Sequence, residues 1–198
     1  MSKEIEVRIK IDPQALETAK KWLTKNAEYL GEKEHIEYYL NKPATSFFFT
    51  APEGYKDAID YLRVRLTEQG DSICFKKLYE DPIEKRPLYC EEYESEVADG
   101  KKVLELFKAL GYTDQTLMQK TRQIYTFDCF EIVIDHVKDL GIFMEVELKT
   151  EIPNIKAGIN LIYDFIRSIG IKRFELQTRG YVSMLWNPTY NFGQIMEL

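Results

Sequence analysis

Residues 4–11 alternate strictly between charged and apolar side chains, and this alternation restricts the segment to one kind of structure. Successive side chains of an extended strand point to opposite faces, so Glu4, Glu6, Arg8 and Lys10 share one face and only apolar residues share the other. Such a strand needs an apolar core on one side and a polar environment on the other. Two carboxylates two residues apart can hold a divalent cation, and cations on the same face can bind the phosphates that such a metal binds.

The same alternation returns along the rest of the chain. The charged residues that share a strand face are Arg63 and Arg65, Lys76, Glu92, Glu94 and Glu96, Lys120 and Arg122, Glu131 and Asp135, and Glu145, Glu147 and Lys149. One strand of this type is typical of an antiparallel sheet with one face in water, so a purely structural domain is one open alternative. If the sheet instead curls with its helices outside, the charges point inward, where a metal and a polyanion would satisfy both signs.

The spacing of the apolar residues predicts three helices and eight strands. The helices are expected after Asp12, with Leu16 to Leu30 at helical spacing, from about 99 to 110, and from about 155 to 169. The predicted strands are 4–11, 34–40, 61–67, 72–79, 90–97, 118–127, 130–137 and 142–149. Residues 41–58 and 80–88 are predicted loops, and the tail after Trp186 is predicted to be irregular. These elements indicate one α+β domain over residues 1–198.

Composition excludes several classes of protein. A formal net charge of -6 argues against a general surface for nucleic acid or anionic membrane, and no apolar run approaches the length of a spanning helix. Three widely spaced cysteines form no CxxC pair, which is typical of reduced thiols in the cytosol, and the N-terminus has no signal-peptide pattern. Two histidines are too few for a His-rich zinc site. We therefore expect a cytoplasmic protein.

Six short motifs occur in an order that resembles the CYTH superfamily, also called triphosphate tunnel metalloenzymes. They are Glu4-x-Glu6-x-Arg8, Leu62-Arg63-Val64-Arg65, Cys74-Phe75-Lys76, Lys120-Thr121-Arg122, Asp135 with Leu140-Gly141-Ile142-Phe143-Met144-Glu145-Val146-Glu147, and Arg179-Gly180-Tyr181-Val182-Ser183-Met184-Leu185. The resemblance covers about 4–185. It departs from the usual pattern at Arg8, where lysine is common, at Cys90, where many members carry arginine, and at Gly180, where serine is common.

The resemblance implies an eight-stranded closed antiparallel β-barrel with helices packed outside and a triphosphate in the lumen. It implies Mg²⁺ or Mn²⁺ held by Glu4, Glu6, Asp135, Glu145 and Glu147, with Glu92 and Glu94 as open candidates for a second metal. Phosphate binding is assigned to Arg8, Lys10, Arg63, Arg65, Lys76, Lys120 and Arg122. The resemblance implies catalytic roles for five residues, namely Glu4, Glu6, Arg8, Lys76 and Glu147.

The sequence leaves three possible activities open, two of them enzymatic and one a binding function. The leading hypothesis is a metal-dependent triphosphatase acting on inorganic tripolyphosphate, thiamine triphosphate or a nucleoside triphosphate. A class IV adenylate cyclase, which would make cyclic AMP and pyrophosphate from ATP, and a non-catalytic triphosphate-binding module are the alternatives. A small-molecule triphosphate is the expected partner, and a homodimer is plausible.

Three features outside these motifs are expected to be structural. His35 is expected at the surface or at a strand edge, and His136 is expected to point away from the face of Asp135. The aromatic patch at 47–49 is expected to pack a loop or an interface, since exposed aromatic patches often mark interfaces.

Overall fold

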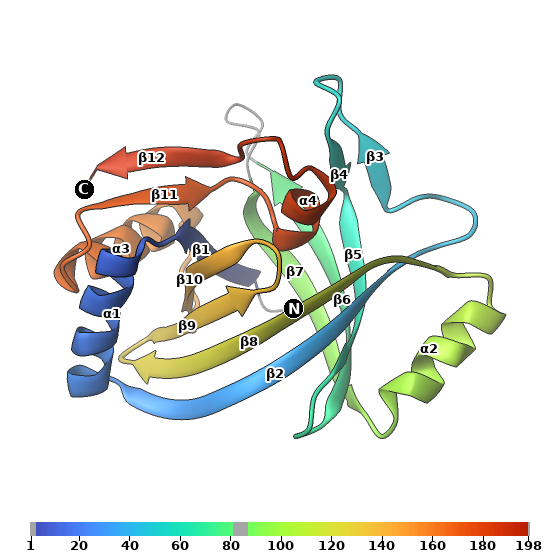
Figure 1. Ribbon diagram of the computed structural model, residues 1–198, viewed down its shortest axis with the longest axis horizontal. Helices are drawn as coiled ribbons and strands as arrows, with labels where there is room; N and C mark the ends of the chain where they lie inside the picture. The colour runs from blue at the N-terminus through green and yellow to red at the C-terminus, as the bar shows by residue number, and fades with distance from the viewer. Residues whose placement is uncertain (1–2, 81–86, 198) are drawn as a thin grey trace.

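Antiparallel pairing closes eight strands into a ring, as Figure 1 shows. The computed structural model describes residues 3–80 and 87–197. The elements are β1 (Lys3–Lys10), α1 (Pro13–Asn26), β2 (Glu28–Asn41), β3 (Phe48–Thr50), β4 (Lys56–Ala58), β5 (Asp60–Leu66), β6 (Asp71–Glu80), β7 (Pro87–Val97), α2 (Gly100–Ala109), β8 (Thr113–Phe127), β9 (Phe130–Val137), β10 (Gly141–Leu148), α3 (Ile155–Ser168), β11 (Arg173–Gln177), α4 (Tyr181–Trp186) and β12 (Gly193–Glu197).

The first strand closes the ring. The strand order is β10-β9-β8-β2-β5-β6-β7-β1, and β1 then pairs with β10 from Ile5↔Leu148 to Lys10↔Phe143. On its other edge β1 pairs with β7 only near its start, and its far end pairs with β11, which β12 extends. The predicted α+β fold with an eight-stranded antiparallel ring is confirmed.

The apolar strand faces point outward and pack under the helices, which lie outside the strand ring in Figure 1. Ile5, Val7 and Ile9 of β1 join the apolar faces of β9 and β10 and the buried residues of α1 and α3 in one core. A second cluster places Leu104 of α2 against β5. Because the apolar faces are used on the outside, the charged faces are left to line the interior.

The three predicted helices begin at the predicted positions, although the cap of the third, Asn154, was not predicted. Asp12, Asp99 and Asn154 each accept a hydrogen bond from a backbone N–H of the first turn, which satisfies a donor that the helix itself cannot. The first helix was expected to reach Leu30, and this is wrong. Ala27 is already extended, and Tyr29 pairs with Tyr125 in the β2–β8 ladder. Backbone hydrogen bonds to β8 therefore decide the conformation here, and the helical spacing of Ala27 and Leu30 is coincidental.

The loops and the tail contain structure that the sequence patterns did not reveal. The predicted loop 41–58 includes the short β3–β4 hairpin, and the tail forms β12 against β11. Strands of three residues are too short to show a period, which explains the first omission. Phe47 is buried against Leu62 and Phe75, as expected for a packed loop. The predicted loop 80–88 lies mostly outside the described residues. Among the described helices, none has the length and apolar character needed to cross a membrane.

Candidate functional site

The charged faces of the ring strands meet around one interior cavity of about 260 Å³. Of the residues that the sequence assigned to the site, those lining it are Glu4, Glu6, Arg8, Arg63, Arg65, Lys76, Glu92, Glu94, Lys120, Arg122, Glu145 and Glu147. Their convergence follows from the two-residue period, because every second side chain of each strand faces inward once the ring closes. Cross-strand register then sets neighbours, with Glu6 opposite Glu147, Arg8 opposite Glu145 and Lys76 opposite Glu92.

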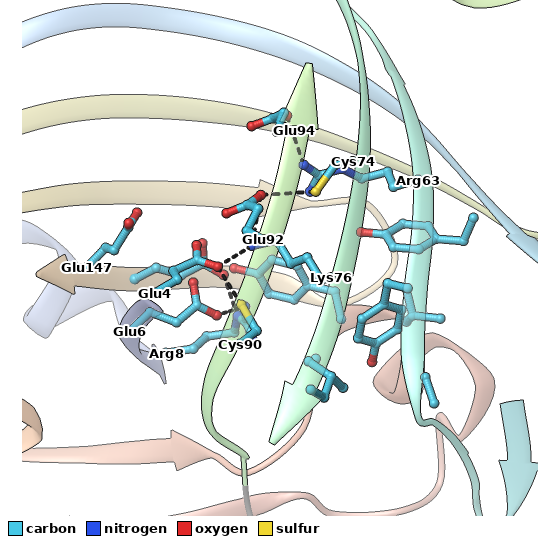
Figure 2. A pocket seen from close by; sticks show the side chains of 18 of the residues that line it. Glu4, Glu6, Arg8, Arg63, Cys74, Lys76, Cys90, Glu92, Glu94 and Glu147 are labelled. Atoms are coloured by element: carbon cyan, nitrogen blue, oxygen red, sulfur yellow. Dashed lines mark hydrogen bonds and ion pairs between the residues drawn. The ribbon is translucent and has the colours of Figure 1, made fainter. Parts of the chain in front are cut away.

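Three carboxylates, Glu4, Glu6 and Glu147, lie on one side of the cavity and are called the acidic cluster here. Among the described residues, only Cys74, Glu92 and Glu94 have ligand atoms close enough to one another to share one ion without any side-chain movement. Figure 2 shows Glu4, Glu6 and Glu147 close together, with Lys76 and Cys90 beside Glu4. The Lys76 ammonium lies 2.6 Å from Glu4 Oε2, and the Cys90 thiol donates to the same oxygen at 2.7 Å. Although burial alone would raise the pKa of Glu4, these two neighbours hold it at about 2.

The other two carboxylates are pushed toward the protonated form. Burial, followed by the charges of Glu4 and Glu6, raises the pKa of Glu147 to about 7, even though Lys149 lies 3.0 Å from its Oε1. Burial also raises the pKa of Glu6, with contributions from Glu145 and Glu4 that Arg8 opposes. Burial disfavours the charged form of a carboxylate, and neighbouring like charges add to this effect.

The acidic cluster offers the donor chemistry that a hard divalent cation needs, although its side chains would have to move closer together to share one ion. Carboxylate oxygens are the donors that Mg²⁺ and Mn²⁺ prefer, and a cation would relieve the repulsion from Glu4 and Glu6 that adds to the effect of burial on the pKa of Glu147. Glu4, Glu6 and Glu147 are therefore the residues that would hold such an ion. Glu145 is less available, because Arg8 Nε and Arg122 Nη2 each donate to one of its oxygens.

We expect the affinity for Mn²⁺ to rise with pH up to about 7. Glu147 must lose its proton to bind a cation, so below its pKa each pH unit should weaken binding up to about tenfold. Calorimetric titration with Mn²⁺ at several pH values measures this effect, and a flat Mn²⁺ affinity between pH 5.5 and 7 would contradict the assignment.

The same raised pKa of Glu147 should make the metal-free protein lose stability as the pH rises from about 4.5, the pKa in the unfolded state, to about 7. The reason is that the native state holds the proton more tightly than the unfolded state does. Metal-free thermal melts at several pH values measure this effect.

Cations form the facing wall of the cavity, and each is paired with a carboxylate. Arg122 donates to both oxygens of Asp135 at 2.7 and 2.5 Å, and Lys120 Nζ lies 3.2 Å from Asp135 Oδ2. Arg63 Nη2 lies 3.3 Å from Glu94 Oε1. Arg8 and Lys120 also lie over the Tyr181 ring, at 4.5 and 5.3 Å from its centroid. Arginine and lysine held in this way present donors that suit phosphate oxygens.

Asp135 lies behind this wall and not on the cavity surface. It is completely buried, and Arg122, Lys120 and the Tyr181 hydroxyl occupy its two oxygens. The sequence assigned it to metal binding because its strand parity and its motif are right. Its environment fits a carboxylate that holds cations better than one that ligates a metal.

Lys10 does not reach the cavity either, although the period of β1 puts it on the correct face. It is exposed, and its Nζ lies 5.8 Å from the centroid of the Phe143 ring. Phe143 packs edge-on against Tyr181, with ring centroids 5.0 Å apart. These buried aromatic side chains fill the interior at the end of β1, so Lys10 lies beyond the closed end of the lumen.

Sequence reasoning missed two buried carboxylates and their partners. Glu37 of β2 accepts from Arg65 and from the Tyr39 hydroxyl, and Asp57 of β4 accepts from Arg179 and Ser183. The signal for Glu37 was present, since it alternates with His35 and Tyr39 on one face of a predicted strand. His35 was expected at the surface or at a strand edge, but it is buried in β2 on this inner face, and burial lowers its pKa to about 4. His136 is exposed and points away from the buried Asp135, as expected.

The charges around the cavity nearly balance. Among the residues that the structure describes, eight cationic and nine carboxylate side chains line it. A lining of this composition does not attract a polyanion by net charge alone. It suits a polyanion that arrives together with divalent cations, since the acidic cluster can take the cation and the facing wall can take the phosphates.

Comparison with known proteins places this geometry in a family. Residues 2–181 match the sequence profile of the CYTH domain. A Methanocaldococcus jannaschii protein named as a candidate adenylate cyclase is 25% identical over 184 residues, which cover 91% of this chain and 97% of the relative.

Solved structures share the architecture. The PH1012 protein of Pyrococcus horikoshii superposes with a TM-score of 0.70 at 26% identity, covering 90% of this chain and 97% of that chain. HpAC1 of Hippeastrum, a candidate adenylyl cyclase for which a dominant triphosphatase activity is described, superposes with a TM-score of 0.64 at 15% identity, covering 96% of this chain and 98% of that chain. The second likeness shows a shared fold.

Proposed function

This chain belongs to the CYTH domain family, and on that premise we propose that it is a divalent-metal-dependent enzyme that hydrolyses a small-molecule triphosphate inside its strand ring. The observation that supports the proposal is the meeting of an acidic cluster and a cationic wall around one cavity. A module that only binds phosphate needs the cations but has little use for Glu4, Glu6 and Glu147 together. The carboxylates therefore favour an enzyme over a binding module.

The proposed mechanism relies on positioning and charge neutralisation, which dominate phosphoryl transfer. Glu4, Glu6 and Glu147 would hold Mg²⁺ or Mn²⁺, and a bound cation supplies charge neutralisation at the phosphate oxygens. Arg63, Arg65, Lys120 and Arg122 would bind the phosphate chain from the opposite wall. Arg8 and Lys76 lie at the boundary between the two walls, next to Glu6 and Glu4, so they are placed to stabilise charge on the phosphoryl group in transfer.

The end of the cavity next to α4 is compatible with hydrolysis by water. Tyr181 and Val182 of α4 line this end, and the buried Asp57–Arg179 ion pair fastens the β3–β4 hairpin beside α4. A substrate that enters this end must be compact, as the terminal phosphates of a triphosphate are. Attack of water on the terminal phosphorus would give a diphosphate and phosphate.

Adenylate cyclase activity is the second candidate, because the M. jannaschii relative carries that name. In that reaction a ribose 3′-hydroxyl attacks the α-phosphorus of ATP and displaces pyrophosphate. The same lining could bind the triphosphate in either reaction, and the product identifies which phosphorus reacts.

A substrate panel tests the proposal. The protein is incubated with tripolyphosphate, thiamine triphosphate and ATP, each with Mg²⁺ or Mn²⁺, and phosphate, pyrophosphate and cyclic AMP are measured separately. We expect phosphate release that requires the divalent ion. Cyclic AMP formed in equal amount with pyrophosphate would replace the hydrolase with the cyclase, and tight binding without turnover of any substrate would favour a binding module.

A further inference from the structure

Glu37 is a fully buried carboxylate that lies behind the cationic wall of the cavity. Its Oε1 lies 2.8 Å from Arg65 Nε, 3.7 Å from Arg63 Nη1 and 3.9 Å from Lys120 Nζ. Its Oε2 accepts a hydrogen bond from the Tyr39 hydroxyl at 2.9 Å. Three of the proposed phosphate-binding cations therefore lie close to one oxygen of a single carboxylate, and the other oxygen accepts a hydrogen bond.

The position of β2 in the ring explains this convergence. β2 pairs with β5 on one edge and with β8 on the other, and Glu37 stands opposite Arg65 on the first and Met118 on the second. Cations from both neighbouring strands can thus reach the same inward-facing residue. Glu37 is not among the described residues that line the cavity, so it would act on a ligand through these cations.

We propose that Glu37 is a positioning residue that fixes the guanidinium groups of Arg63 and Arg65 in the orientation that binds phosphate oxygens, an inference that rests on the proposed function. Arginine side chains have many rotamers, and ordering them during binding weakens affinity. A buried charge-assisted hydrogen bond such as Arg65 Nε to Glu37 orders the side chain before the ligand arrives. Arg63 Nε is also buried without a hydrogen-bond partner among the described residues, so the Nη groups of Arg63 are the ones left to contact a ligand.

Charge and positioning make opposite predictions for substitutions of Glu37. If Glu37 contributed only its charge, Glu37→Gln would bind a polyanion more tightly, because one negative charge near the cations is removed. Glu37→Asp would then behave like the wild type, because the charge is kept. If Glu37 positions the arginines, both variants should bind less tightly, since the aspartate is one methylene shorter and the amide makes weaker hydrogen bonds to Arg65.

The binding test uses tripolyphosphate with a chelator and no divalent metal, so that no turnover occurs. Isothermal titration of the full-length protein should show Glu37→Asp and Glu37→Gln weakened by about tenfold, which corresponds to losing the prior ordering of two long side chains. Glu34→Gln is the matched control, because Glu34 is on the same strand but exposed on the other face, and its affinity should equal that of the wild type. Equal affinity of Glu37→Asp and wild type, or tighter binding by Glu37→Gln, would overturn the positioning role.

A spectroscopic measurement separates positioning from a general loss of structure. In wild type the Arg65 Nε–H signal should exchange slowly with water, and in Glu37→Asp it should be lost while backbone signals of β5 and β8 are retained. If the Glu37 variants do not fold, Tyr39→Phe removes only the hydrogen bond to Oε2, and it should weaken tripolyphosphate binding by roughly threefold. Unchanged binding by a folded Tyr39→Phe would then count against the inference.

Kinetics provide a second criterion and distinguish the two proposals. With Mn²⁺, the factor by which Glu37→Asp raises KM should be about ten times the factor by which it lowers kcat. The Mn²⁺ concentration for half-activation should stay within about twofold of that of the wild type. If the wild-type protein neither binds nor hydrolyses tripolyphosphate or the other triphosphates, the proposed function fails and this inference fails with it. If wild type binds and Glu37→Asp binds equally well, only the positioning role is wrong.

Discussion

Glu147→Gln is expected to lower metal-dependent triphosphate turnover by about 100- to 1,000-fold, because it removes one of the three carboxylates proposed to hold the divalent cation. Glutamine keeps the size of the side chain but offers a neutral amide in place of an anionic oxygen. Steady-state phosphate release at several Mn²⁺ concentrations measures the loss. We also expect the half-activating Mn²⁺ concentration to rise, because the remaining Glu4 and Glu6 supply fewer anionic ligands.

Loss of activity in this variant should not come from unfolding. Glu147 lies beside Glu4 and Glu6, whose charges help to raise its pKa to about 7, so removing its charge relieves repulsion in the metal-free protein. At pH 8 the metal-free Glu147→Gln protein should therefore melt at the same temperature as wild type or higher. Glu151→Gln, an exposed residue beyond β10, is the control and should retain wild-type turnover. Full activity of Glu147→Gln would remove Glu147 from the metal site.

Asp135→Asn is expected to cause the largest loss of stability among substitutions of the charged residues in and behind the cavity wall. Asp135 is completely buried and bonds Arg122, Lys120 and Tyr181, so the amide would remove one counter-charge from two buried cations, leaving Glu145 for Arg122 and the more distant Glu37 for Lys120. Removing one partner of a buried ion pair typically costs about 3–5 kcal/mol of the free energy of unfolding. For a chain of this length that corresponds to a fall of about 6–20 °C in Tm, which calorimetry or circular dichroism can measure.

An exposed ion pair supplies the control for this prediction. Asp114 lies 2.7 Å from Lys108, and both side chains are about half exposed. Exposed pairs contribute about 0–1 kcal/mol, so Asp114→Asn should shift Tm by only a few degrees. Similar Tm values for Asp135→Asn and Asp114→Asn would show that the buried pairs around Asp135 are not needed for the fold.

The stability of Asp135→Asn should also respond to ligand. In the variant, Arg122 and Lys120 have each lost one counter-charge, and a polyanion can replace it. Tripolyphosphate should therefore raise the Tm of Asp135→Asn by more than it raises that of the wild type. A smaller shift in the variant would indicate that Asp135 mainly orders these cations for phosphate, as proposed for Glu37 and its arginines.

Much of the site was predictable because strand parity is a local property. The alternation in β1 puts Glu4, Glu6 and Arg8 on one face whatever the strand pairs with, and Glu145 and Glu147 of β10 follow the same rule. The order of the motifs along the chain then indicated the family, which the comparison supports over residues 2–181.

Element boundaries and short elements were less predictable, because they depend on partners distant in sequence. Ala27 and Leu30 have the spacing of a helix face, but β8 draws this segment into a ladder of paired strands. β12 forms because β11 offers it an edge, and nothing within the tail itself has a strong strand period. In both places a distant strand supplied the hydrogen bonds that decided the local conformation.

The sequence by itself determined which side chains share a face, because the two-residue period of a strand depends only on neighbouring residues. The tertiary structure alone decided which of those side chains reach the cavity. Lys10 has the right parity but lies beyond Phe143 and Tyr181, which fill the interior, whereas Asp135 and Glu37 lie behind the cations that face the lumen. How close a side chain comes to the cavity depends on the packing of side chains from strands that are distant in the sequence, and no local pattern encodes that packing.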